Sequence, residues 1–82
     1  MYWEIAFPSK TFDRSTITCT AQVSGVDGAV LAASDPLVVP VTDFSTVPLP
    51  PFRVTVTGIY VVRLYVDSEL SWSASVDIFV VD

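Results

Sequence analysis

The sequence predicts an all-β domain: a small antiparallel immunoglobulin-like β-sandwich, or a partly open barrel, with about six or seven strands. Apolar and polar residues alternate with a period of two in several segments, which places each set on one face of a strand. Turn signals containing Gly or Pro separate these segments. Since the chain has 82 residues, we assign residues 1–82 to a single β-sandwich domain.

The first predicted strand covers residues 2–7. Trp3, Ile5 and Phe7 alternate with less apolar residues, and Pro8 ends the strand because proline has no N–H to give to a β-ladder. The next residues, 9–15, are polar and predict a connection.

Residues 16–24 show the cleanest alternation in the chain and predict the second strand. Threonine and β-branched residues suit its pleated, half-exposed surface. The residues expected to face the core are Ile17, Cys19, Ala21 and Val23. Residues 25–28, Gly-Val-Asp-Gly, are a strong turn signal. They lead into residues 29–33, which predict a short strand or, because alanine and leucine favour helix, a helical turn.

Prolines shape the middle of the chain. Residues 37–41 are apolar but contain Pro40, so we expect them on a sheet edge or crossing between sheets. Residues 42–51 carry three prolines and predict an extended, polyproline-like connection. Residues 52–57 alternate again and predict a strand. Its inward residues are expected to be Phe52, Val54 and Val56.

Residues 58–82 predict one long β-hairpin, the element around which the domain is organised. The inward residues of its first arm are Tyr60, Val62, Leu64 and Val66. Those of its second arm are Leu70, Trp72, Ala74, Val76, Ile78 and Val80.

The register of this hairpin follows from parity. Directly opposed residues share a face, so the two numbers in each pair must add to an even number. A three-residue loop over 67–69 satisfies this condition. The resulting pairs are Val66 with Leu70, Leu64 with Trp72, and Val62 with Ala74. Such loops usually have a glycine in a left-handed conformation, and none is present here, so we expect a strained or longer turn.

The outward side of the hairpin carries the candidate interaction site. Its residues are unusually apolar for a face opposite the core, and they are Ile59, Val61, Tyr65, Phe79 and Val81. One interpretation is a surface for self-association or for a partner protein. The other is a central strand covered by the proline-rich segment.

A row of serines on the second arm, Ser71, Ser73 and Ser75, is a further surface feature. It predicts either a plain solvent face or an exposed edge that accepts another strand by β-augmentation.

Residues able to carry chemistry are scarce. The chain has no histidine, which excludes imidazole catalysis and ligation, and its only cysteine, Cys19, is expected in the core. Asp67 and Glu69 are interpreted as a solvated turn, and a calcium site at Asp27 is not favoured. Three glycines form no phosphate-binding loop. We therefore predict a protein that is not an enzyme, with no catalytic, cofactor-binding or metal-binding residues and no cofactor.

Charge and hydropathy restrict the partners. The net charge is −5 with four basic residues, which argues against direct nucleic-acid binding. No apolar run approaches the length of a membrane span, and the N-terminus has no signal-peptide pattern. The single cysteine allows no internal disulfide. We expect a soluble, cytoplasmic protein, or a virion component if it is phage-encoded, with a second copy or another protein as its partner and no membrane.

Several segments carry a family resemblance. They are the Val-Asp-Gly turn at 26–28, Pro-Leu-Pro-Pro-Phe at 48–52, Gly-Ile-Tyr-Val-Val-Arg-Leu-Tyr-Val-Asp at 58–67 and Phe-Val-Val at 79–81. Residues 16–82 thereby resemble the later part of a family of small bacterial immunoglobulin-like β-sandwich proteins of unknown function. Residues 67–68 are Asp-Ser where that family has Asp-Gly, and the family's first hairpin has no counterpart. The resemblance implies the fold and no activity.

Two functional hypotheses follow. The first is a non-enzymatic structural or protein-interaction module that self-associates through apolar sheet faces or an edge strand, of bacterial or phage origin. The second is an acidic inhibitor or decoy protein that blocks a basic site on a partner. The first depends on the apolar outward residues, and the second on the nine acidic residues. The salt dependence of binding distinguishes the two hypotheses, because charge-driven binding weakens with ionic strength and apolar association does not.

Overall fold

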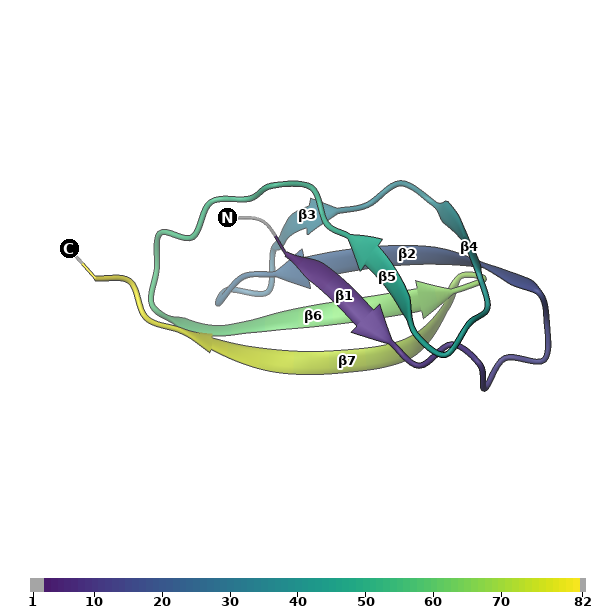
Figure 1. The fold of residues 1–82 in the computed structure, drawn as a ribbon. Coiled ribbons are helices and arrows are strands. Elements are labelled where there is room, and N and C mark those ends of the chain that lie inside the picture. The colour runs from purple at the N-terminus through teal and green to yellow at the C-terminus, as the bar shows by residue number, and fades with distance from the viewer. Residues whose placement is uncertain (1–2, 82) are drawn as a thin grey trace.

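The computed structural model describes residues 3–81, and all regular elements in that range are strands (Figure 1). The strands are β1 (Glu4–Phe7), β2 (Thr16–Ser24), β3 (Val30–Ala33), β4 (Leu37–Pro40), β5 (Ser45–Pro48), β6 (Gly58–Val66) and β7 (Glu69–Ile78). The prediction of an all-β domain is confirmed. The described residues form no helix that could cross a membrane.

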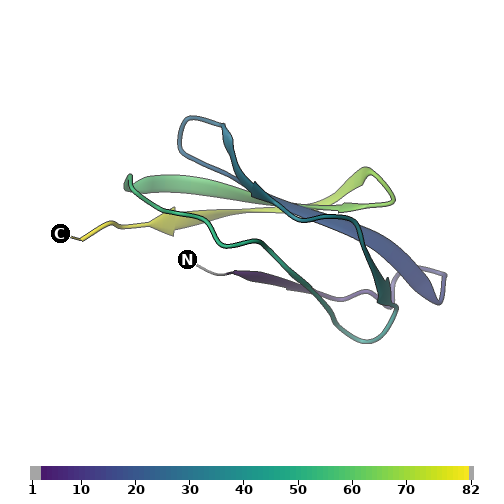
Figure 2. The same cartoon turned by 90° about the horizontal axis from the view of Figure 1, so that it is seen from above.

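The seven strands form two antiparallel sheets that do not close into a barrel. The large sheet has the order β3-β2-β6-β7, with β4 as its fifth strand. β3 and β4 lie along the same edge of β2: β4 pairs with residues 16–19 of β2, and β3 pairs with residues 22–24. The small sheet contains only β1 and β5. Figure 2 shows the two sheets as separate layers, with β1 below the large sheet. The architecture is therefore a small β-sandwich with layers of unequal width.

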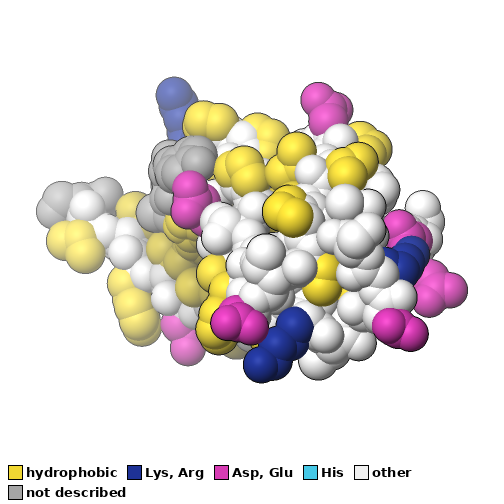
Figure 3. Space-filling model, turned by 45° about the vertical axis from the view of Figure 1, so that its right-hand side comes forward, with side chains coloured by type: hydrophobic (Ala, Val, Ile, Leu, Met, Phe, Trp, Pro, Cys, Tyr) yellow, Lys and Arg dark blue, Asp and Glu magenta, His cyan; other side chains and the backbone are white. Residues whose placement is uncertain are grey.

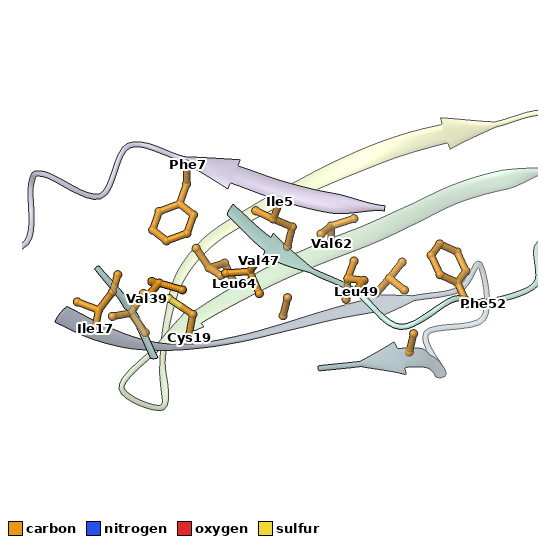
Figure 4. Packing of buried hydrophobic residues seen from close by; sticks show 14 of the residues in the cluster. Ile5, Phe7, Ile17, Cys19, Val39, Val47, Leu49, Phe52, Val62 and Leu64 are labelled. Atoms are coloured by element: carbon orange, nitrogen blue, oxygen red, sulfur yellow. The ribbon is translucent and has the colours of Figure 1, made fainter. Parts of the chain in front are cut away.

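The core lies between the two sheets. Ile5 and Phe7 of the small sheet point toward Val62 and Leu64 of the large sheet (Figure 4). The predicted inward residues of β2 and of the first hairpin arm are all buried. Because these alternate residues are buried, the prediction of both strands from their apolar–polar alternation is confirmed.

The β6–β7 hairpin confirms part of the predicted register. Leu64 lies opposite Trp72 and Val62 opposite Ala74, as expected. The pairing of Val66 with Leu70 is wrong, because Val66 lies opposite Glu69. The register shifts directly after Leu64, and β7 contains one additional residue there.

This shift is a β-bulge at Ser71, and it explains the short turn. The loop has two residues, Asp67 and Ser68, both with positive φ angles of 51° and 70°. Two positive φ angles are typical of a type I′ turn, whose twist matches that of the flanking strands. A two-residue loop alone would direct the inward residues of β7 outward, and the additional residue in the bulge restores the inward face from Trp72 onward.

Two predictions for the middle of the chain are wrong. Residues 52–57 form no strand, and Val56 is exposed rather than inward. Residues 42–51 were predicted to be an extended connection because of their prolines, but residues 45–48 of this segment form the strand β5. Pro48 is tolerated because it is the last residue of β5, opposite Glu4. The alternative of a helical turn at 29–33 is also excluded, because β3 is a strand.

β7 is less buried than its alternation predicts. The prediction of an inward Leu70 is wrong: beyond the bulge Leu70 lies opposite Tyr65 on the outer face, and it is exposed. Among the inward residues, Trp72 retains 43% of its accessible surface, whereas Ala74, Val76 and Ile78 are half-buried. The reason is topological. β7 is the end strand of the large sheet, and the two-stranded small sheet is too narrow to cover it.

Candidate interaction surfaces

The outer face of the large sheet carries three of the predicted interface residues. Ile59 is 55% exposed, and Val61 and Tyr65 are half-buried. The proline-rich segment does not cover this face, because Leu49 and Phe52 are buried in the core on the opposite side of the sheet. The interpretation that the proline-rich segment covers this face is therefore wrong at Ile59, which is open to solvent.

Polar contacts divide this outer face. The amide Nε2 of Gln22 donates a 3.1 Å hydrogen bond to the hydroxyl of Tyr65. Nη1 of Arg63 donates a 3.0 Å hydrogen bond to Oγ of Ser24. Arg63 lies between Val61 and Tyr65 along β6, so Tyr65 belongs to a polar region.

Ile59 and Val61 therefore belong to an apolar end of the sheet, near the point where β7 finishes. Phe79 and Val81 follow β7 and are 78% and 88% exposed. Val26 packs against Gly58 from the inner side of the sheet, where it lies near Tyr60, and does not belong to this outer face. A Cβ on Gly58 would lie 2.6 Å from Cγ2 of Val26, so only glycine fits there.

A groove on the inner side of β7 is the second candidate surface. It has a volume of about 380 Å³ and lies between β1 and β7, the strands at the open side of the sandwich. Its lining is mostly apolar and consists of Trp3, Glu4, Ile5, Ala6, Leu49, Val62, Trp72, Ala74 and Val76. The sequence alone did not reveal this groove. The inward apolar residues of β7, such as Trp72 and Val76, are visible in the sequence. They line a groove only because β7 is an end strand, which the sequence does not show.

Among residues 3–81, the charged side chains form no concentrated site. Figure 3 shows acidic and basic side chains spread over one face of the molecule. Asp67 forms an ion pair with Arg14, and Lys10 Nζ lies 3.7 Å from Asp43. Within residues 3–81 no group of three potential metal ligands comes together. The carboxylate of Asp27 accepts a 3.0 Å hydrogen bond from the N–H of Ala29 and so stabilises its own turn.

The only cysteine has no accessible surface. Cys19 lies in β2 among the core residues, as the sequence predicted. Burial, and secondly the negative charge of Asp67, raises the pKa of its thiol above the ordinary value of 9.0. A neutral, enclosed thiol is a poor nucleophile, so Cys19 acts as a small apolar residue.

Comparisons with protein-family models, curated proteins and solved structures gave no match to this chain.

Proposed function

We propose that this domain is a non-enzymatic protein-interaction module that self-associates through the apolar end of its large sheet. The observation that supports this is the exposure of Ile59 on a sheet face that the proline-rich segment leaves open. Soluble monomers rarely expose large continuous apolar patches, and those that do use them for binding. The cellular setting that we propose is the cytoplasm, or a virion if the protein is phage-encoded.

The residues of this patch come from neighbouring strands. Ile59 lies opposite Asp77, and Phe79 follows two positions later on the same side of the chain. Diagonal neighbours of this kind are within reach of aromatic side chains. Val61 lies next to Ile59 on the same face, with Ser75 and Asp77 as their partners on β7, and Phe79 follows where β7 ends. The proposed contact consists of Ile59, Val61 and Phe79. We call this set the apolar end.

We further propose an immunoglobulin-like layout for the sandwich. In such domains strands B and E share one sheet, and strands C′, C, F and G share the other. The orders β1-β5 and β3-β2-β6-β7 correspond to this arrangement in chain order. The hydroxyl of Tyr60, near the start of β6, donates a hydrogen bond to the carbonyl of Val56. This contact is similar to the tyrosine corner of immunoglobulin-like sandwiches.

The test is the solution mass of the wild type and of two charged variants, Ile59→Lys and Val61→Lys, by light scattering over a concentration series. We expect a wild-type oligomer at both low and high salt and a monomer for each variant, because a buried unpaired charge opposes association. Thr46→Lys is the matched control, since Thr46 is an exposed strand residue of the small sheet. It should keep the wild-type mass.

A wild-type monomer at every concentration would contradict the proposal. An oligomer that dissociates steeply with salt would also contradict it, because apolar contacts are not screened by ions. The first outcome, a monomer, would instead direct the search to foreign partners of the acidic surface, as the inhibitor or decoy hypothesis requires.

A further inference from the structure

The groove between β1 and β7 lies where a strand is missing from the sandwich. Among residues 3–81, β1 pairs only with β5, and β7 pairs only with β6. In the immunoglobulin-like layout, strand A lies beside strand B, the position of β1 here. The groove is therefore a mostly apolar space where the immunoglobulin-like layout would place a further strand beside β1.

An apolar strand suited to this space is present in the same chain. After β7, the N–H of Val80 donates a 2.8 Å hydrogen bond to Oγ1 of Thr57, and the chain then runs outward (Figures 1 and 2). The alternation of residues 79–81 places Phe79 and Val81 on one side and Val80 on the other. The first two are the most exposed large apolar side chains of the described residues.

These residues cannot fill the groove of their own molecule. β7 itself lines the groove with Trp72, Ala74 and Val76, and residues 79–81 follow directly after its last residue. They would have to reverse direction within one residue to lie beside β7. By parity, Phe79 and Val81 also face the side opposite to the groove. A second copy of the chain can present the segment without these restrictions.

We infer that residues 79–81 of one copy insert as an extended strand into the β1–β7 groove of a second copy. Phe79 and Val81 then point into the groove, and the added backbone lies along a sheet edge, as in β-augmentation. This inference rests on the self-association proposed above and adds a second contact, in which Phe79 enters the groove while Ile59 and Val61 remain as the sheet-face contact.

The area involved is consistent with a reciprocal dimer. Phe79 and Val81 together would bury about 250 Å², given that a Phe side chain alone buries about 150–250 Å². With a similar area from the groove, one insertion buries about 500 Å² and a reciprocal pair about 1,000 Å², the lower limit for a specific interface. A single insertion would be too small, so we expect each copy to donate and accept a strand.

The experiment uses intrinsic fluorescence, because both tryptophans of the chain, Trp3 and Trp72, line the groove. The probe is a synthetic peptide with the sequence of residues 77–82, Asp-Ile-Phe-Val-Val-Asp, which contains no tryptophan. Titrating it into the 82-residue protein, diluted until light scattering shows a monomer and no second copy fills the groove, should shift the emission to shorter wavelength and reach saturation, as Trp72 loses contact with water. A peptide with serine in place of Phe79 and Val81 should bind at least about tenfold more weakly, since it lacks both apolar anchors.

The matched protein variant is Ala74→Phe, in which the new ring occupies the groove. Ala74 is half-buried on a strand, where an aromatic residue is well tolerated. We expect this variant to lose the response to the peptide. An equal response to the serine peptide, or an undiminished response of the Ala74→Phe variant, would overturn the inference, as would the absence of any saturable shift in the wild type.

Failure of this inference is separable from failure of the proposed function. Ile59 lies outside the groove, so Ile59→Lys should still respond to the peptide. A wild-type oligomer without peptide binding would remove the groove contact and leave the apolar end as the interface.

Discussion

The main-chain N–H of Asp67 donates a 2.9 Å hydrogen bond to the carbonyl oxygen of Thr18. The carboxylate of Asp67 accepts a longer bond, 3.4 Å, from the N–H of Thr18. These contacts attach the β6–β7 turn to β2, the neighbouring strand. Together with the ion pair to Arg14, they hold Asp67 in its left-handed conformation.

The neighbouring turn residue, Ser68, should be improved by glycine. Its φ of 70° costs a non-glycine residue about 1–2 kcal/mol, whereas glycine adds about 0.5–1 kcal/mol of unfolded-state entropy. We expect Ser68→Gly to raise the melting temperature by about 2–4 °C, since about 0.5 kcal/mol remains. Calorimetry would measure the change.

The control for this turn variant is Ser73→Gly in the regular part of β7. Glycine inside a strand should lower the free energy of unfolding by about 0.5–1 kcal/mol. If Ser68→Gly destabilises the domain as much as Ser73→Gly does, the assignment of a type I′ turn is wrong.

The hydroxyl of Tyr60 is expected to contribute measurably to stability. Tyr60 is buried, and its hydrogen bond satisfies the carbonyl of Val56 at the entry to β6. Tyr60→Phe should lower the free energy of unfolding by about 1–1.5 kcal/mol, the net contribution of one such bond. Denaturant unfolding would measure this loss.

Tyr65→Phe is the matched control for the buried hydroxyl. Tyr65 is half-buried, and its partner, Gln22, can reach water when the bond is lost. We expect a change of less than about 0.5 kcal/mol. Equal losses for the two variants would show that the Tyr60 contact has no special structural role.

The thiol of Cys19 should make stability fall in alkaline solution. Its pKa in the folded domain is raised above 9.0 by burial and by Asp67, so the unfolded chain releases this proton at lower pH than the folded domain does. The stabilisation is therefore complete below about pH 9 and is lost as the pH rises through the folded pKa. Urea unfolding between pH 7 and pH 10.5 would follow this loss.

The variant Cys19→Ala isolates the thiol from the other groups that titrate in this range. Its stability should be lower at pH 7, because a buried group is removed, but should decline less between pH 9 and pH 10.5. A thiol reagent at pH 8 should also react with the wild type only when it unfolds. Parallel pH curves, or rapid labelling of the folded domain, would contradict the assignment of Cys19 as an enclosed, neutral group.

The strand pattern could be predicted from the sequence because alternation is a local property. Each inward residue of β2 and β6 was identified correctly, and Leu64 was correctly paired with Trp72. The candidate residues Ile59, Phe79 and Val81 were expected to face outward, and the structure leaves them exposed. Whether they form an interface stays a prediction.

Other features depended on contacts between distant segments. The bulge at Ser71 compensates for a turn whose length is fixed by the attachment of Asp67 to β2. β5 forms because residues 45–48 find β1 as a partner, which outweighs the low strand propensity of proline.

The sequence by itself determined which residues face each side of a strand, because side chains alternate along any extended backbone. Only the tertiary structure decided which of those faces are covered, because covering depends on the order and number of strands in the opposing sheet. Trp72 and Val62 show the difference. Both belong to predicted inward sets, but Val62 lies on a central strand beneath β1, and Trp72 lies on the end strand beside an open groove.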